Sequence, residues 1–354
     1  MSRGTVGLLV ACVLLSSALS SIPFSLLVGK IKTNTLVLIL SVTCCAPVLS
    51  LWTSNFTTLL LLRICFGISV GGLFPILAPV MMRWFPKNEL PLINAAAIAS
   101  VSAGIAISFL TGEHLAASMG WKMTLSVFSS MSILSAIFWF LLSGRDEIVA
   151  SSNLSITGIR SVIRSKVTLL LAFGDTGALL QYVALSAWLP TYYFERHGMS
   201  LAEASLKAAI LPICGLFIVV AGGLLSLRIK SRKPFMFISG ITLGICGFSS
   251  VIFADSPLLL LILILYGAGT WLYVPFLATI PLEVEGSTPE KAAAMTACMF
   301  TIGGSLSFIA PIMIGFLADY TGSYIYGFAF VGVISWSLFV ATYFLPETGY
   351  SGKA

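Results

Sequence analysis

The stretch PLLLLILILYGAGTWLYVPFLATIPL, residues 257–282, decides the class of fold. It runs for 26 residues without one charged side chain. As a helix it is long enough to cross the roughly 30 Å of hydrocarbon in a membrane, for which about 20 residues suffice. A helix satisfies its own backbone hydrogen bonds in lipid, whereas a lone strand or loop does not. The stretch is therefore predicted to be a transmembrane helix.

Runs of this kind recur along the whole chain and predict eleven transmembrane helices. Their ends are set by charged and turn-forming residues, as hydropathy reading requires. The predicted fold class is an all-α membrane protein with spans at 6–28, 34–53, 56–82, 92–112, 122–143, 166–190, 203–226, 234–254, 257–282, 291–316 and 324–345.

The composition excludes a soluble protein. Hydrophobic residues make up 58% of the chain and charged residues only 9%, and the mean hydropathy is +1.04. Soluble domains carry about a quarter charged residues, because something polar must face water. The seven cysteines all lie inside apolar runs with no metal-ligand spacing. No nucleotide-binding loop is found, so we expect neither an enzyme nor a bound metal or cofactor.

The basic residues predict the orientation. Of the 19 Lys and Arg, fourteen fall on one side of the predicted spans, four on the other, and Arg63 lies within a span. Cytoplasmic loops carry the excess of basic residues, so the richer side, which includes the C-terminus, is predicted to be cytoplasmic in the plasma membrane. The net charge of +6 reports this topology and attraction to anionic lipid, and no nucleic-acid partner is expected.

A polar stretch divides the chain into two predicted helical bundles. Residues 144–165, SGRDEIVASSNLSITGIRSVIR, are rich in Ser, Arg and Asp and lie on the predicted cytoplasmic side. We expect an N-terminal bundle of five spans at 1–143, this segment as a linker, and a C-terminal bundle of six spans at 166–354.

The two halves resemble each other at a shift of about 200 residues. Ser25–Lys32, SLLVGKIK, aligns with Gly223–Lys230, GLLSLRIK, and Pro75 aligns with Pro275. Both halves keep the same orientation, as in parallel repeats related by an axis along the membrane normal. Residues 166–198 have no counterpart, because their partner would precede the first residue. We therefore expect that one helix of the N-terminal half is missing.

Local motifs complete a resemblance to a known family. They are Leu62–Gly67 (LRICFG), Arg83–Pro86 (RWFP), Gly120–Lys122 (GWK), Trp188–Tyr192 (WLPTY) and Leu345–Gly349 (LPETG). Together with the two halves and the central linker, they resemble the major facilitator superfamily of transporters, and most closely its cyanate-permease and 2-nitroimidazole-transporter branch. The resemblance implies a monomer that moves a small solute by alternating access.

The loop after the second helix of each family half, which gates transport, departs from the family pattern. The family reads Gly-x-x-x-Asp-Arg-x-Gly-Arg, and here the matching positions include Gly29, Lys30 and Lys32, with Arg228 and Lys230 in the second half. The acidic residue is absent, so the resemblance does not carry over a charge latch to this loop.

Two charged residues inside predicted spans are candidates for transport chemistry, because an ion in hydrocarbon is costly. Arg63 lies roughly 10 Å deep from the outer side and Asp175 roughly 14 Å deep from the inner side, so both are expected at similar heights in one shared cavity. Arg63 either attracts a substrate anion, takes part in proton coupling, or holds a neighbouring helix. Asp175 either carries a proton, pairs with Arg63, or reaches water at the inner interface.

Polar side chains continue from Asp175 along one helical face. Tyr182 and Ser186 follow it at i+7 and i+11, Gln181 flanks them, and such a stripe usually faces a cavity or another helix. Aromatic Trp271 and Tyr273 in the ninth span either line a small-solute site or serve as core or interface residues.

Three functional hypotheses follow. The first is secondary active or facilitative transport of a small anionic solute, with the proton as the candidate coupling ion for symport. The second is efflux of hydrophobic compounds, which is disfavoured because the Gly-Pro-x-x-Gly-Gly pattern of antiporters is not found between Gly104 and Gly112. The third is a truncated, non-transporting fragment, motivated by the missing helix.

Overall fold

The regular elements of the protein are helices. The computed structural model describes residues 2–27, 30–85, 89–143, 162–229, 231–287 and 289–348. Ten helical segments among them are long and apolar enough to cross a membrane. The prediction of an all-helical membrane protein is confirmed.

The predicted spans correspond to the following elements. They are α1 (Arg3–Leu27), α2 (Thr33–Thr43), the 3₁₀ helix η1 (Ala46–Trp52), α3 (Phe56–Trp84), α4 (Leu90–Leu142), α6 (Lys166–His197), α7 (Leu201–Arg228), α8 (Lys233–Ile252), α9 (Leu259–Glu283), α10 (Pro289–Ser307), α11 (Ile309–Thr321), α12 (Ile325–Ser335) and α13 (Ser337–Phe344).

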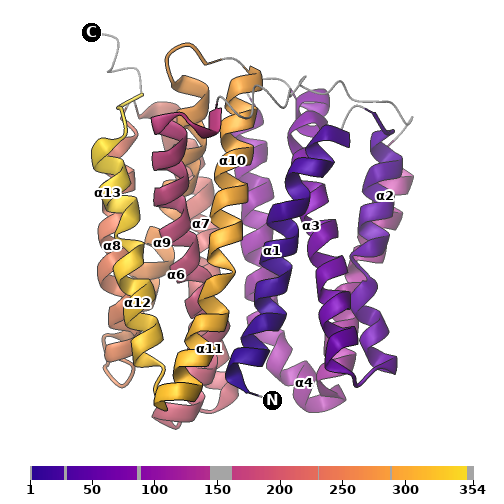
Figure 1. Ribbon diagram of the computed structural model, residues 1–354, viewed down its shortest axis with the longest axis vertical. Coiled ribbons are helices and arrows are strands. Elements are labelled where there is room, and N and C mark those ends of the chain that lie inside the picture. The colour runs from indigo at the N-terminus through magenta and orange to yellow at the C-terminus, as the bar shows by residue number, and fades with distance from the viewer. Residues whose placement is uncertain are drawn as a thin grey trace.

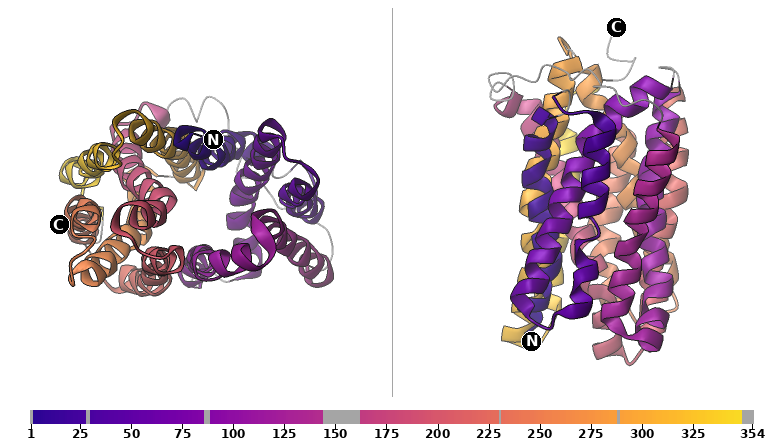
Figure 2. Two further views of the ribbon diagram at one scale, coloured as in Figure 1. Left: turned by 90° about the horizontal axis from the view of Figure 1, so that it is seen from below. Right: turned by 90° about the vertical axis from the view of Figure 1, so that its right-hand side faces the viewer.

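The helices lie roughly parallel to one axis, with α1–α4 on one side and α6–α13 on the other (Figure 1). The two groups meet along two seams. In one, α1 packs against α10 and α11, and in the other, α4 packs against α7. The view along the helices shows both seams (Figure 2).

Glycines bring α1 close to its neighbours. A Cβ on Gly67 of α3 would overlap the Oγ atom of Ser16, and one on Gly71 would overlap the carbonyl oxygen of Ser17. On the other side of α1, a Cβ on Gly7 would overlap the carbonyl oxygen of Pro311. Small residues let membrane helices approach closely, so these glycines serve helix packing.

Helix α4 includes residues 113–121, which separate the predicted spans 92–112 and 122–143. The helix continues to Gly120, which has φ 80° and ψ 157°, and a second helical segment follows it. A Cβ on Gly112 would lie 4.0 Å from the ring of Phe128. In a straight helix those positions would be roughly 24 Å apart along the axis, so the chain reverses at Gly120. Residues 113–119 are therefore helical, and the reversal falls between the same two predicted spans.

Prolines accompany two of the helix breaks. Proline has no N–H, so the carbonyl four residues earlier loses its helical partner. Pro47 leaves the Thr43 carbonyl without a helical partner, and α2 ends at Thr43, with η1 following. Pro311 does the same to the Ser307 carbonyl, where α10 ends. Helix α6 instead continues through Pro190 and ends at Gly198, whose φ of 65° suits a helix cap. Helix α6 therefore extends beyond the predicted span end at residue 190.

Several predicted gating-loop residues lie at one end of the molecule. The C-terminal ends of α1, α3, α7 and α9 lie at the same end, opposite the N-terminal end of α1 (Figure 1). Lys30, Lys32 and Arg228 are exposed there. Gly29 and Lys230 lie outside the described residues, as do positions 144–161 of the predicted linker.

Candidate functional site

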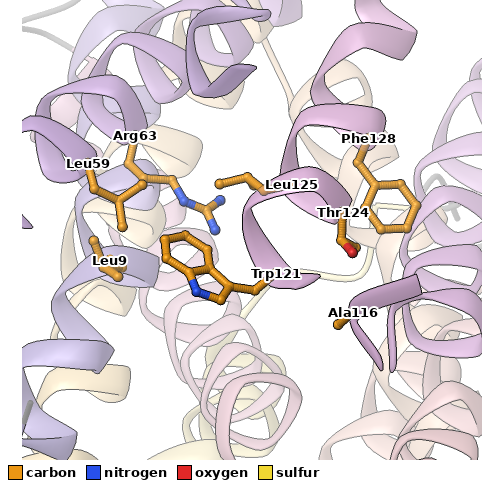
Figure 3. A pocket seen from close by; sticks show the side chains of 8 residues that line it. All are labelled: Leu9, Leu59, Arg63, Ala116, Trp121, Thr124, Leu125 and Phe128. Atoms are coloured by element: carbon orange, nitrogen blue, oxygen red, sulfur yellow. The ribbon is translucent and has the colours of Figure 1, made fainter. Parts of the chain in front are cut away.

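Arg63 lines a cavity between α1, α3 and α4. The cavity has a volume of about 280 Å³, and its walls are formed by Leu9, Leu59, Arg63, Ala116, Trp121, Thr124, Leu125 and Phe128. The Arg63 guanidinium points into the space beside Trp121 and Leu125 (Figure 3). The Gly120 reversal places both segments of α4 against this space, since Ala116 precedes the reversal and Trp121 follows it.

The charge of Arg63 has no compensating partner within the described part of the chain. Its Nε atom is buried without a hydrogen bond, and none of the ion pairs found in that part involves it. An unpaired cation among mostly apolar side chains favours an anion as its partner.

Asp175 and Tyr273 form a second polar group, between α6 and α9. The Tyr273 hydroxyl donates a hydrogen bond of 3.0 Å to the Oδ1 atom of Asp175, and both side chains are buried. The other carboxylate oxygen faces α10, where a Cβ on Gly303 would lie 3.3 Å from it. No cation pairs with Asp175 among the residues that the structure describes.

Tyr182, Ser186 and Trp271 meet about two to three turns further along α6 than Asp175. The rings of Tyr182 and Trp271 are in edge contact, with centroids 5.5 Å apart. The Tyr182 hydroxyl, the Ser186 hydroxyl and the Trp271 Nε1 atom are buried and lie beside one another. Buried polar atoms are costly unless they are hydrogen-bonded, so these three groups are each other's nearest partners.

Glycines on the neighbouring helices make room for this group. The Trp271 ring occupies the position that a Cβ on Gly215 of α7 would take, at 2.5 Å. Gln181 points to the other side of α6 and lies against Gly247 of α8, and its Oε1 atom also lacks a hydrogen-bond partner.

The structure thus brings some predicted site residues together and separates others. Asp175 contacts Tyr273, and Tyr182 contacts Trp271, each pair joining α6 to α9. The expected shared cavity for Arg63 and Asp175 is not found in the described ranges, because the residues that line the Arg63 cavity come from α1, α3 and α4. Depth along a helix was the basis of that expectation, and depth does not fix the direction in which a side chain points.

Tyr266 belongs to the second polar group and was missed in the sequence. Tyr273 follows it at i+7 on the same face of α9, and the buried Tyr266 hydroxyl lies beside Thr270. The i, i+4, i+7 spacing of Tyr266, Thr270 and Tyr273 could have indicated from the sequence that the three share one face of the helix.

An ion cluster at the end of the molecule that holds the N-terminus of α1 was also missed in the sequence. Arg3 of α1 lies 2.7 Å from Glu195 of α6 and 3.6 Å from Asp319 of α11. Tyr324 donates a hydrogen bond to the same Glu195 oxygen at 3.1 Å, and its ring lies beneath the Arg3 guanidinium. These contacts join the two groups of helices. Each of the three charges lies at a helix end, where sequence reading predicts only solvation.

The predicted gating-loop residues form no comparable cluster among the described residues. Lys30, Lys32 and Arg228 are exposed, whereas the neighbouring Arg232 is buried and binds Glu283 at 2.6 Å. No sequence pattern distinguishes Arg232 from the other basic residues of this region.

Comparisons with known proteins agree with this architecture. A sequence model of the Major Facilitator Superfamily matches residues 1–307. The chain is 23% identical over 350 residues to a nitrite extrusion protein of Bacillus subtilis, covering 96% of this chain and 85% of that protein. It is 23% identical over 305 residues to a hexuronate transporter of Bacillus subtilis, covering 78% and 70%. It is 26% identical over 284 residues to a cyanate transport protein of Escherichia coli, again covering 78% and 70%.

Proposed function

The chain belongs to the Major Facilitator Superfamily, and from this premise we propose that it transports a small anion by alternating access. Membership makes it a multi-pass transmembrane transporter and not an enzyme. The proposal adds the charge of the solute, the site that binds it and the secondary active or facilitative mechanism.

The observation that carries the proposal is the uncompensated guanidinium of Arg63. A fixed cation inside a cavity favours a negatively charged occupant, and the bound anion would offset the cost of keeping the cation there. The names of the three relatives refer to nitrite, hexuronate and cyanate, all of them anions, which supports the same charge for the solute here.

The test is uptake of labelled anions into proteoliposomes. Arg63→Gln is expected to lower uptake at least tenfold, and Arg63→Lys is expected to retain part of it because the charge remains. Lys207→Gln is the matched control: it removes one positive charge from an outer helix end, where Lys207 pairs with Glu203. Uptake that is the same in wild type and Arg63→Gln would remove the basis for an anionic solute.

We propose further that Asp175 carries the coupling proton. Its carboxylate is buried, and its hydrogen-bond partner in the described part of the chain is the neutral Tyr273, which supports a group able to take up and release a proton. A role of Tyr182, Ser186 and Trp271 in binding the solute stays a proposal for the C-terminal half, separate from the Arg63 cavity, whereas Gln181 packs against α8.

The topology that accompanies this function has eleven crossings. We propose that the 51-residue candidate span at Leu92–Leu142 makes two of them, because the chain reverses at Gly120. The proposal also includes two bundles, at 1–143 and 166–354, joined by a linker at 144–165. It places a monomer in the plasma membrane with its C-terminus in the cytoplasm. Labelling of Ser152→Cys only from the cytoplasmic face is expected; labelling only from outside would reject this orientation.

Efflux of hydrophobic compounds is the second candidate. The apolar lining of the Arg63 cavity favours it. A pump for uncharged hydrophobic compounds would not depend on Arg63, so resistance of cells to such compounds, measured with wild type and Arg63→Gln, separates the two functions.

A further inference from the structure

The cavity around Arg63 carries a more specific conclusion about the solute. Of its eight lining residues, only Arg63 and Thr124 place a polar group among walls that are otherwise aliphatic or aromatic. The Thr124 hydroxyl already donates a hydrogen bond of 3.0 Å to the Gly120 carbonyl. Thr124 therefore has no hydrogen left to donate, and it offers only a lone pair.

The aromatic wall does not replace these missing donors. The indole nitrogen of Trp121 lies on the side of the ring away from the Arg63 guanidinium, while the ring carbons face it (Figure 3). Phe128, Leu125, Leu59 and Leu9 contribute carbon only. Hydroxyl groups on a bound solute would lose water here without gaining partners, which is costly.

The size of the cavity points the same way. A volume of about 280 Å³ is on the order of nine times the ~30 Å³ that one water occupies in the liquid. An inorganic anion such as nitrite or nitrate fills roughly two of these water volumes and would leave the apolar walls wet. A solute with an apolar body would bury those walls instead.

We propose that the Arg63 cavity selects an amphipathic monoanion, a carboxylate or sulfonate with a compact apolar body, over inorganic oxyanions and polyhydroxylated acids. The acid group binds the guanidinium, which presents paired N–H donors to planar or tetrahedral oxyanions. The apolar body lies between Trp121 and Phe128. This inference rests on the proposed function, since it names the class of anion for the same site.

The experiment compares sulfonates that share one acid group. Sulfonates stay charged, so they do not leak across membranes as neutral acids. Binding of benzenesulfonate, methanesulfonate and 2-hydroxyethanesulfonate to the full chain in lipid nanodiscs is measured by titration calorimetry. Benzenesulfonate is expected to bind at least about tenfold more tightly than the other two, because it alone buries apolar area against the walls. Its binding is also expected to show a negative change in heat capacity.

Two matched variants on α3 locate the apolar contact. Leu59 precedes Arg63 by one turn and shares its face, and Leu59→Trp would fill the cavity. Leu61 is 57% exposed and points away from the cavity. Leu59→Trp is expected to remove the preference for benzenesulfonate, and Leu61→Trp to leave it unchanged. Leu59→Phe, a smaller change, serves if Leu59→Trp does not fold.

The outcomes separate this inference from the proposed function. If methanesulfonate and nitrate bind as tightly as benzenesulfonate, and Arg63→Gln weakens all of them, the site is an anion site but the inference about its apolar selectivity is wrong. If Arg63→Gln leaves benzenesulfonate binding unchanged, both the inference and the proposal that Arg63 binds an anion are wrong. Loss of benzenesulfonate binding in Arg63→Gln and Leu59→Trp, but not in Leu61→Trp, supports both.

Discussion

Arg63 is costly where it lies, among leucines and aromatic rings. On insertion scales an arginine at the centre of a span costs about 2.5–3.5 kcal/mol. Among the described residues no carboxylate offsets that cost, which argues that the charge is retained for binding and not for stability.

Arg63→Leu is accordingly expected to raise the stability of the empty protein while abolishing anion uptake. The gain should be on the order of 1–3 kcal/mol, because an apolar side chain replaces an unpaired ion. Thermal unfolding in detergent micelles measures it. A lower melting temperature for Arg63→Leu would instead mean that Arg63 holds neighbouring helices together.

Asp175 gives a prediction about coupling at the same scale. Asp175→Asn keeps the shape of the side chain but cannot exchange a proton at the pH of transport. It is expected to lose accumulation driven by a proton gradient and to retain exchange of solute at equal concentrations. Tyr273→Phe removes the hydrogen bond of 3.0 Å and should change the pH dependence of accumulation without abolishing it. If Asp175→Asn still accumulates solute, the proton is carried elsewhere.

Sequence spacing found most of these residues but not their partners. The interval of seven from Asp175 to Tyr182 placed both on one helical face, since that interval is close to two turns. The contacts of Asp175 with Tyr273 and of Tyr182 with Trp271 depend on how α6 and α9 are rotated about their axes. That rotation is set by packing against α7 and α8, through residues such as Gly215 and Gly247, which one sequence does not reveal.

At the scale of elements, Gly120 is the residue on which α4 depends. Its φ of 80° and ψ of 157° lie in a region that is essentially restricted to glycine. Gly104, in the same helix, has ordinary helical conformation, and a Cβ added to it would meet open space.

Gly120→Ala is expected to destabilise the protein by about 1–3 kcal/mol, because alanine is strained at this backbone conformation. Gly104→Ala is the control and should be neutral or stabilising by up to about 1 kcal/mol, since alanine favours helix. Melting temperatures of both variants in micelles provide the comparison. Equal melting temperatures would show that the chain does not need this conformation to reverse.

Helix existence was readable from the sequence, whereas several helix ends were not. Apolar length predicts a span because of the thickness of the membrane, and this predicted a helix in every run. Proline gave a weaker signal: Pro311 accompanies a break, whereas Pro190 lies within an uninterrupted α6. The predicted missing helix of the N-terminal half stays a prediction.

At the scale of the whole molecule, the two groups of helices are joined at the end that holds the N-terminus of α1. The ion cluster of Arg3 with Glu195 and Asp319 lies beside the close contact of α1 with α11. Alternating access requires this contact to separate during each cycle. None of the three charges was a candidate from the sequence, because the cluster forms only when residues from α1, α6 and α11 are brought together.

The most direct test of the transport cycle is a reversible cross-link across this seam. A Cβ on Gly4 would lie 3.8 Å from the Cβ atom of Phe316, a separation suited to a disulfide. Gly4→Cys and Phe316→Cys, made together in a variant without the seven native cysteines, are expected to oxidise and to stop anion uptake, which returns on reduction; each single variant should transport throughout. Full uptake by the oxidised double variant would contradict alternating access through separation of these helices.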